Sequence, residues 1–210
     1  MKADLRARLR EATGEAHARM HTHPGFAAAA SGHISARDYR DLLARLYGFH
    51  RGFEAHFDRA PAAMAQAIAL PARRRSAALA EDLRALGLQD IEALPLWPAP
   101  LALESEPQWL GALYVTEGAT LGGAAISRAL AEARFGAAQR RFFEGYGAER
   151  SPMWRSFLAR LERHAEDPEA AAAQTAAEAA FSAFEAWMRD WRGASGPEHG
   201  RHRLDQIELL

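Results

Sequence analysis

Apolar residues recur in steps of three and four over most of this 210-residue chain, which is the spacing of amphipathic α-helices. The first such stretch covers residues 4–21, where Asp4 is a suitable N-cap and Pro24-Gly25 marks an end. A second begins at the cap Ser35 and is predicted to end near Arg59. The apolar stripes are Leu5, Leu9, Ala12, Ala16 and Met20 in the first helix, and Leu42, Leu46, Phe49, Phe53 and Phe57 in the second.

The remainder of the chain shows the same periodicity, interrupted by one loop. Residues 91–105 contain three prolines and no clear period, so they are predicted to be irregular. No stretch of useful length alternates between apolar and polar residues, as a strand would. We therefore predict an all-α fold, a single-domain bundle of seven or eight helices over residues 1–192, with a polar C-terminal tail at 193–210. The further helices are predicted at 62–70, 72–87, 106–130, 137–146, 151–165 and 168–191.

Charge and composition exclude several classes of protein and of site. The net charge of −1, without a basic stripe, argues against a nucleic-acid partner. The absence of cysteine excludes disulfides, thiolate zinc sites and cysteine nucleophiles. No run approaches the roughly 20 apolar residues of a membrane span, and the first residues lack the apolar core of a signal peptide. We therefore expect a soluble, cytoplasmic protein with no membrane partner.

One predicted helix, within residues 111–130, has a face that consists almost entirely of glycine and alanine. Gly111, Gly118 and Gly122 fall within a narrow arc at helical period, together with two alanines, Ala125 and Ala129. Four glycines inside a helix cost roughly 4 kcal/mol against alanine, so something is expected to lie close to this backbone. It is either another helix, packed on the small residues, or a flat ligand lying across the turns. The adjacent Gly122-Gly123 pair also permits a kink.

A histidine at the edge of the first helix's apolar stripe is the main candidate for chemistry. His17 is either a half-buried core residue or a ligand, and Arg10 lies on the same face about two turns before it. His21, one turn beyond His17, permits a zinc pair, but no third ligand is near in sequence. Two other features are interpreted as solvated surface: the pair His50 and Glu54, and the arginine run at 73–75.

A metalloporphyrin would use the histidine, the cation and the bared helix together. An imidazole supplies one axial bond to the iron. Arginines pair with the two carboxylates of the porphyrin. The glycine helix can lie against the other face, with its backbone beside the open position of the iron. The motifs of serine hydrolases, P-loop enzymes, zinc peptidases, dinucleotide-binding folds and di-iron bundles are all absent from the sequence.

These residues resemble the heme oxygenase family. Residues 9–17, LREATGEAH, are similar to its proximal helix, and the resemblance implies that His17 is the iron ligand. Residues 114–123, YVTEGATLGG, resemble its distal helix, which implies that Gly118, Gly122 and Gly123 flex over the heme and serve catalysis. Residues 32–50 are similar to bacterial members, especially those that supply biliverdin to bacterial phytochromes.

The resemblance also implies further heme contacts and one departure. Arg10 and Thr13 fall on the proximal helix as cofactor-binding positions, and Arg155, in the stretch Trp154-Arg155-Ser156, matches an arginine that pairs with a heme propionate. Better-known animal enzymes have an aspartate where this chain has Ala119. Either the water network beside the iron is held differently here, by backbone and other side chains, or oxygen activation is impaired.

The implied function is a heme oxygenase, with heme as both cofactor and substrate. The ring would be opened to biliverdin with release of carbon monoxide and ferrous iron, using molecular oxygen and an external electron donor. A bacterial phytochrome is a candidate recipient of the biliverdin. The alternatives are a carrier that binds heme or a bilin without turnover, and a domain of the same fold with another small ligand or an interaction role.

Overall fold

The computed structural model describes residues 4–98, 100–166 and 168–191, and the tail predicted at 193–210 lies outside this range. Within it all regular structure is helical, which confirms the all-α prediction. The longer helices are α1 (Leu5–His21), α3 (Ala36–Glu54), α5 (Ser76–Ala85), α6 (Glu106–Glu132), α8 (Arg150–Leu161) and α9 (Glu169–Met188). The shorter ones are α2 (Pro24–Ala30), α4 (Ala62–Ala67) and α7 (Arg141–Glu144), with 3-10 turns at Phe57–Arg59, Leu70–Arg73, Ala137–Gln139, Gly147–Glu149 and Glu162–His164.

Two of the predicted helix starts are confirmed by their capping bonds. The carboxylate of Asp4 accepts a hydrogen bond from the Ala7 N–H at 2.9 Å, and the Ser35 hydroxyl accepts one from the Asp38 N–H at 3.0 Å. Pro24 does follow the end of α1, but it also begins α2, because proline is well tolerated in the first turn of a helix.

Other helix boundaries differ from the prediction. α3 ends at Glu54 rather than near Arg59, because the next residues tighten into a 3-10 turn. α8 covers Arg150–Leu161, so it begins one residue before the predicted start at 151 and ends before the predicted end at 165. α5 begins only at Ser76, since the Glu54 carboxylate accepts hydrogen bonds from the backbone N–H groups of Arg75 and Ser76.

This last contact also corrects two interpretations of surface residues. Glu54 is 1% exposed and serves as an anchor for the start of α5, so it does not form a solvated pair with His50, which is itself buried. Arg73 and Arg75 are also buried rather than solvated. The arginine run was misassigned because its burial depends on contacts with α3 and α6, which are distant in sequence.

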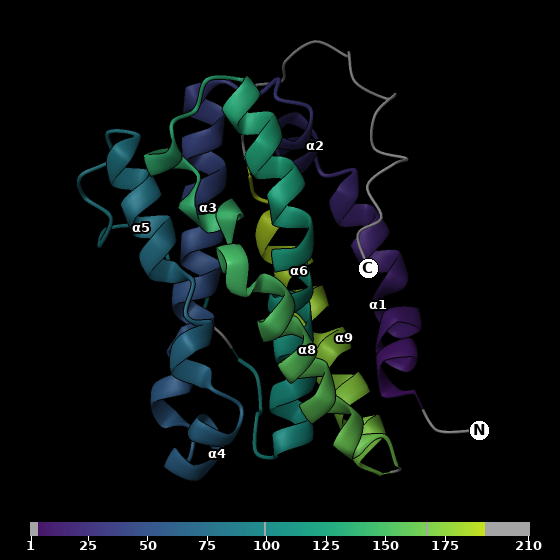
Figure 1. Ribbon diagram of the computed structural model, residues 1–210. Coiled ribbons are helices and arrows are strands. Elements are labelled where there is room, and N and C mark those ends of the chain that lie inside the picture. Colours follow the sequence, from purple (N-terminus) through teal and green to yellow (C-terminus); the bar gives the residue numbers. More distant parts are fainter. Residues whose placement is uncertain (1–3, 99, 167, 192–210) are drawn as a thin grey trace.

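Helix α6 runs through the middle of the bundle, as Figure 1 shows, and α2, α7, α8 and α9 pack against it. α9 lies along α6, and α1 packs on α9, while α3 and α5 pair with each other on another side. The close approach of α9 needs the small residue at Gly111, where an added β-carbon would lie 2.0 Å from the carbonyl oxygen of Ala173. α6 therefore packs closely against α9 at Gly111.

Candidate functional site

A cavity of about 380 Å³ lies between α1 and α6, and residues of α2, α3, α7, α8 and α9, together with Arg75, complete its walls. This volume is within the usual range for a small-molecule site. The cavity is lined mainly by apolar and aromatic side chains, and no carboxylate of the described residues is among them. It brings together most of the residues singled out in the sequence, namely Arg10, Thr13, His17, Gly118, Gly122 and Gly123.

His17 is on the α1 wall of the cavity and is partly buried. Its ring stands edge-on to the rings of His21 and Phe181, with centroids 4.5 and 6.2 Å away, respectively. Burial lowers the pKa of His17, and the neighbouring His21 and Arg10 lower it further. The imidazole is therefore neutral at neutral pH and keeps a nitrogen lone pair for a metal. No hydrogen bond within the described residues occupies either ring nitrogen.

Two further α1 residues lie beside His17 along the same wall. Arg10 is exposed and lines the cavity, so its guanidinium stands where a ligand carboxylate at the rim could pair with it. Thr13 is buried, and its hydroxyl donates a hydrogen bond to the Leu9 carbonyl oxygen at 2.7 Å. Because its proton is engaged in this way, the Thr13 hydroxyl can act towards the cavity only as an acceptor.

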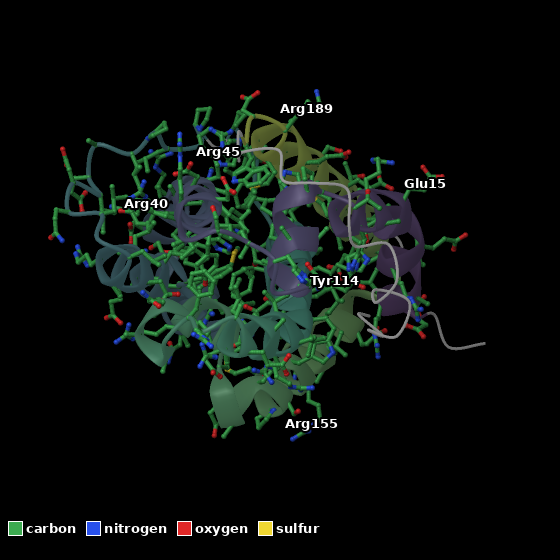
Figure 2. All side chains as sticks on the ribbon, turned by 90° about the horizontal axis from the view of Figure 1, so that it is seen from above. Glu15, Arg40, Arg45, Tyr114, Arg155 and Arg189 are labelled. Atoms are coloured by element: carbon green, nitrogen blue, oxygen red, sulfur yellow. The ribbon has the colours of Figure 1, made fainter. Side chains whose placement is uncertain are left out.

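Arg155 is the one sequence-predicted site residue that the cavity does not include. It is exposed on α8, next to the buried Trp154, which does line the cavity. Figure 2 shows the Arg155 side chain at the periphery of the molecule, whereas Tyr114 of α6 lies in the interior. Its assignment to a heme propionate stays a prediction that the lining of the cavity does not support.

The glycines of α6 have different surroundings, close backbone at some positions and open space at another. At Gly118 an added β-carbon would have no neighbour within 4 Å, so this turn leaves bare backbone facing open space. At Gly123 it would lie 2.7 Å from the carbonyl oxygen of Phe143. Gly123 thus permits close packing of α7, as Gly111 permits close packing of α9, and Gly118 leaves room for a ligand.

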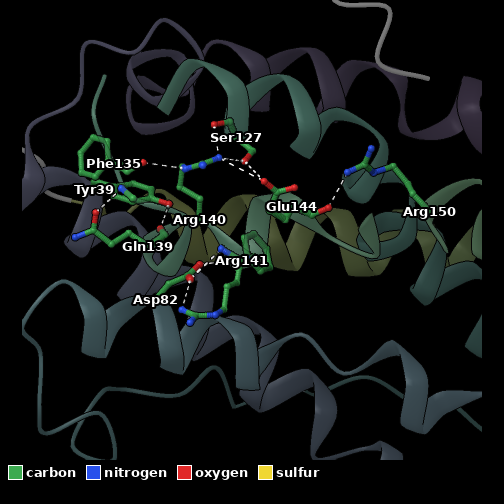
Figure 3. A network of polar contacts seen from close by, with 11 residues as sticks. Tyr39, Asp82, Ser127, Phe135, Gln139, Arg140, Arg141, Glu144 and Arg150 are labelled. Carbon is green, nitrogen blue, oxygen red and sulfur yellow. Dashed lines mark hydrogen bonds and ion pairs between the residues drawn. The ribbon is translucent and has the colours of Figure 1, made fainter. Parts of the chain in front are cut away.

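Helix α7 carries the aromatic wall formed by Phe142 and Phe143, and a polar network holds it (Figure 3). The Asp82 carboxylate accepts hydrogen bonds from the backbone N–H groups of Arg141 and Phe142, both at 2.9 Å. On the other side, Arg140 donates to the carbonyl oxygens of Phe135 and Ser127. Burial raises the pKa of Asp82 to about 6, despite the two backbone N–H donors. This four-residue helix is therefore held in place at its N-terminal end by hydrogen bonds to distant segments.

The cavity residues that sequence reasoning did not assign to the site include two polar ones that were interpreted as solvated surface, His50 and Arg75. His50 is 6% exposed, and burial, together with the positive charge of Arg75, lowers its pKa to about 3. The available signal was its position four residues after Leu46, which places it on the buried face of α3. Nothing in the sequence indicated that Arg75 would be buried.

Behind the cavity wall, α6 is held by a buried ion pair. The Glu117 carboxylate lies 2.6 Å from the Arg73 guanidinium and accepts a hydrogen bond from the Tyr146 hydroxyl at 2.7 Å. Burial raises the pKa of Glu117, against the opposing effect of Arg73. Glu117 does not line the cavity, so it holds α6 in position and does not meet a ligand.

The arrangement fits a flat, largely apolar ligand that carries a metal. One wall offers a neutral imidazole, the opposite wall offers backbone without side chains, and aromatic rings lie between them. Within residues 4–98, 100–166 and 168–191, no three His, Asp or Glu side chains cluster closely enough to hold a metal ion. Among these residues, His17 and His21 therefore lack the further protein ligands of a zinc site. None of the described helices is long and apolar enough to cross a membrane.

Comparison with known sequences points to a single family. The model of the heme oxygenase family matches residues 3–190 of the chain. A curated heme oxygenase from Xanthomonas campestris pv. campestris (strain 8004) is 35% identical over 158 residues, which cover 75% of this chain and 92% of that protein.

Two solved structures share the fold. Heme oxygenase-1 from the cyanobacterium Synechocystis sp. PCC6803, in complex with heme, superposes with a TM-score of 0.71 at 16% identity, over 89% of this chain and 91% of that one. The NO- and CO-bound heme oxygenase from Neisseria meningitidis gives a TM-score of 0.70 at 23% identity, over 93% of this chain and 97% of that one. At these identities the likeness concerns the fold alone.

Proposed function

The chain belongs to the heme oxygenase family, and we propose that the cavity between α1 and α6 is where it binds heme and opens the porphyrin ring. The products are biliverdin, carbon monoxide and ferrous iron. The observation that carries this proposal is the pair of facing walls, with His17 on one side and the open backbone at Gly118 on the other.

The residues present fit heme as the ligand. The His17 imidazole, neutral because burial lowers its pKa, would hold the iron from the α1 side. Gly118 would let the α6 backbone approach the opposite face, since no side chain intervenes there. The aromatic residues Phe142, Phe181 and Trp154 would cover the apolar ring, and Arg10 would pair with a propionate at the rim.

This fit assigns different roles to the heme and to the residues of the chain. When bound, heme supplies the iron centre at which dioxygen is activated and the ring carbon that is oxidised. The chain's own residues orient the ring, keep bulk water from its buried edge, and set which ring edge lies beneath the α6 backbone. Glu117 and Arg73 keep that part of α6 in register with the ring.

The reaction needs molecular oxygen and electrons from an external donor, which we include in the proposal because the family's chemistry requires both. A bacterial phytochrome as the recipient of biliverdin, and a cytoplasmic location, remain predictions from the sequence. The same holds for the residue assignments and for the division between a helical domain at 1–192 and a tail.

Hemin titration followed by reduction tests the proposal. The wild-type chain is expected to give a Soret band at one equivalent of hemin, and ascorbate in air is expected to convert it to a biliverdin spectrum. His17→Ala is expected to change the ligand-field bands and abolish conversion. Because His21 lies one turn away on the same wall, His21→Ala is the matched control and His17→Ala/His21→Ala the decisive variant. A wild-type spectrum in the double variant would refute the assignment of the iron ligand.

A second candidate, a heme carrier without turnover, is favoured by one observation. No carboxylate of the described residues lines the cavity, and Ala119, which does line it, offers no hydrogen bond. The ascorbate experiment separates the two functions, because a Soret band that persists under reductant and air would indicate the carrier.

A further inference from the structure

Two histidines lie next to each other on the α1 wall of the cavity. His17 and His21 are four residues apart, so they share one face of the helix, and both are partly buried and line the cavity. Their ring centroids are 4.5 Å apart, with an angle of 72° between the ring planes. Neither ring forms a hydrogen bond with any residue that the structure describes. Their nitrogen lone pairs are therefore open to a ligand in the cavity.

Two other histidines of the chain are used differently. Both ring nitrogens of His23 and of His164 lie within 3.2 Å of a polar atom of the protein, either a backbone group or a carboxylate oxygen. Each of these rings joins segments that are distant in sequence, His23 to the Met188 carbonyl oxygen and His164 to the Glu106 carboxylate. This structural role does not account for His17 and His21.

The spacing of the His17 and His21 rings suits a shared metal ion. An imidazole nitrogen binds Zn²⁺ at about 2.0–2.1 Å, and the ring centre lies about 1.2 Å behind the nitrogen, so the ion is roughly 3.2 Å from the ring centre. Two imidazoles at neighbouring positions of a tetrahedral or octahedral ion then have centroids roughly 4.5–5.2 Å apart. The observed 4.5 Å falls at the lower end of this range, so the two rings can reach one ion by rotating about their own side-chain bonds.

We propose that His17 and His21 together bind one divalent transition-metal ion, of the Zn²⁺ and Cu²⁺ class, when heme is absent. Imidazole is a common ligand of both ions. The described part of the chain offers no group of three His, Asp or Glu side chains that could hold a metal ion, so water fills the remaining positions. The ion occupies the imidazole that the heme iron needs, and ion and heme therefore exclude each other. The metal site does not depend on the proposed function, whereas this competition with heme rests on it.

Titration of the heme-free chain with Cu²⁺ tests the metal site, because the electron paramagnetic resonance spectrum of bound Cu²⁺ reports how many nitrogens bind it. Wild type is expected to bind one ion in the cavity with two nitrogen ligands. His17→Ala and His21→Ala are each expected to raise the Kd for Cu²⁺ at least about tenfold and to leave one nitrogen, since the chelate is lost. A wild-type spectrum from a single nitrogen, or an unchanged Kd in either folded variant, would overturn the inference.

His33→Ala is the matched control, because it removes an imidazole that is exposed and does not line the cavity. Its affinity for Cu²⁺ is expected to equal that of wild type, and a loss as large as that of His17→Ala would overturn the assignment of the site. Thermal melts of the heme-free variants establish folding, and either of the two cavity variants suffices for the test.

Competition between Zn²⁺ and hemin tests whether ion and heme share His17. At a Zn²⁺ concentration ten times its own Kd, the apparent Kd of wild type for hemin is expected to rise about tenfold. In His21→Ala, the same Zn²⁺ concentration is expected to change the hemin titration of that variant much less. Hemin binding by wild type that Zn²⁺ leaves unchanged overturns this inference alone. A wild-type chain that binds no hemin overturns the proposed function, while the result with Cu²⁺ still decides the metal site.

Discussion

Gly111 and Gly118 are seven residues apart on α6 and therefore lie on nearly the same face of the helix. Their surroundings differ completely. A β-carbon at Gly111 would lie 2.0 Å from the Ala173 carbonyl oxygen, whereas one at Gly118 would have no neighbour within 4 Å. At Gly111 the helix is packed against α9, whereas residues between Tyr114 and Ile126 border the cavity.

The comparison shows two different reasons why a glycine can occur inside this helix. In both positions glycine costs about 1 kcal/mol of helix stability against alanine. At Gly111 this cost is offset by close packing, which can be measured as folding stability. At Gly118 there is no packing to offset it, so the compensation must come from what occupies the cavity. Stability and ligand binding are therefore expected to respond oppositely to substitutions at the two sites.

The largest effect is expected for Gly111→Ala. The added methyl group meets a backbone carbonyl, which cannot rotate away, so α6 and α9 must separate or bend. We expect the free energy of unfolding to fall by roughly 3 kcal/mol, at the upper end of overpacking effects. Urea denaturation of the heme-free protein measures it, with Gly118→Ala as the control. A change below about 1 kcal/mol would show that the α6–α9 contact can relax.

Gly118→Ala is expected to show the reverse behaviour. The heme-free protein should be as stable as wild type or more stable by up to about 1 kcal/mol, because alanine favours the helix. Hemin affinity is expected to fall about tenfold, because the methyl group occupies space that the ring needs. Parallel denaturation and hemin titration test both parts, and unchanged hemin affinity would place the ring away from this turn.

In these helices, the features that could be predicted from the sequence are those that depend on neighbouring residues in the chain. Periodicity and capping residues predicted α1 and the start of α3, because Asp4 and Ser35 act on N–H groups within their own first turn. His17 was identifiable because its position at the edge of a stripe is a local property. The family resemblance then supplied a role for it, which no local pattern provides.

Features that depend on packing between distant segments were not predictable. The Glu54 carboxylate accepts hydrogen bonds from the backbone N–H groups of Arg75 and Ser76, which is 22 residues further along the chain. Arg75, held in this way, lines the cavity. The glycine spacing was visible, but nothing in it distinguished Gly111 from Gly118, because the difference lies in where α9 passes. The role of Arg155 stays a prediction from the sequence match, since this residue is exposed on α8 and is not among the residues that line the cavity.

Gly123→Ala is expected to affect both stability and the heme complex, with a loss of stability smaller than that of Gly111→Ala. Its β-carbon would be 2.7 Å from the Phe143 carbonyl oxygen, but α7 has only four residues and can move more easily than α9. We expect a loss of about 1 kcal/mol in unfolding free energy. A change in the Soret band of the heme complex should accompany it, because Phe143 lines the cavity. Destabilisation as large as that of Gly111→Ala would remove the distinction between the two contacts.

The smallest effect concerns the locked end of α6, where Glu106 pairs with Arg160 and His164. The Arg160 guanidinium is the main reason that the pKa of Glu106 falls to about 2, from an ordinary value of 4.5, and His164 contributes to the same shift. Because the folded-state pKa lies below the unfolded-state value, the pair stabilises the fold above about pH 4.5, and this contribution is lost as the pH falls towards 2. Glu106→Gln is therefore expected to lower stability at neutral pH by up to about 1 kcal/mol.

The same variant should show a shallower loss of stability on acidification than wild type, measured by urea denaturation at a series of pH values. Hemin affinity should not change, since Glu106 does not line the cavity. A variant that matched wild type in acid sensitivity would mean that α6 is held at this end by Gly111 and its apolar neighbours alone. Weakened hemin binding would instead mean that the anchored half and the cavity segment are coupled, and the contrast between Gly111 and Gly118 would then be one of degree.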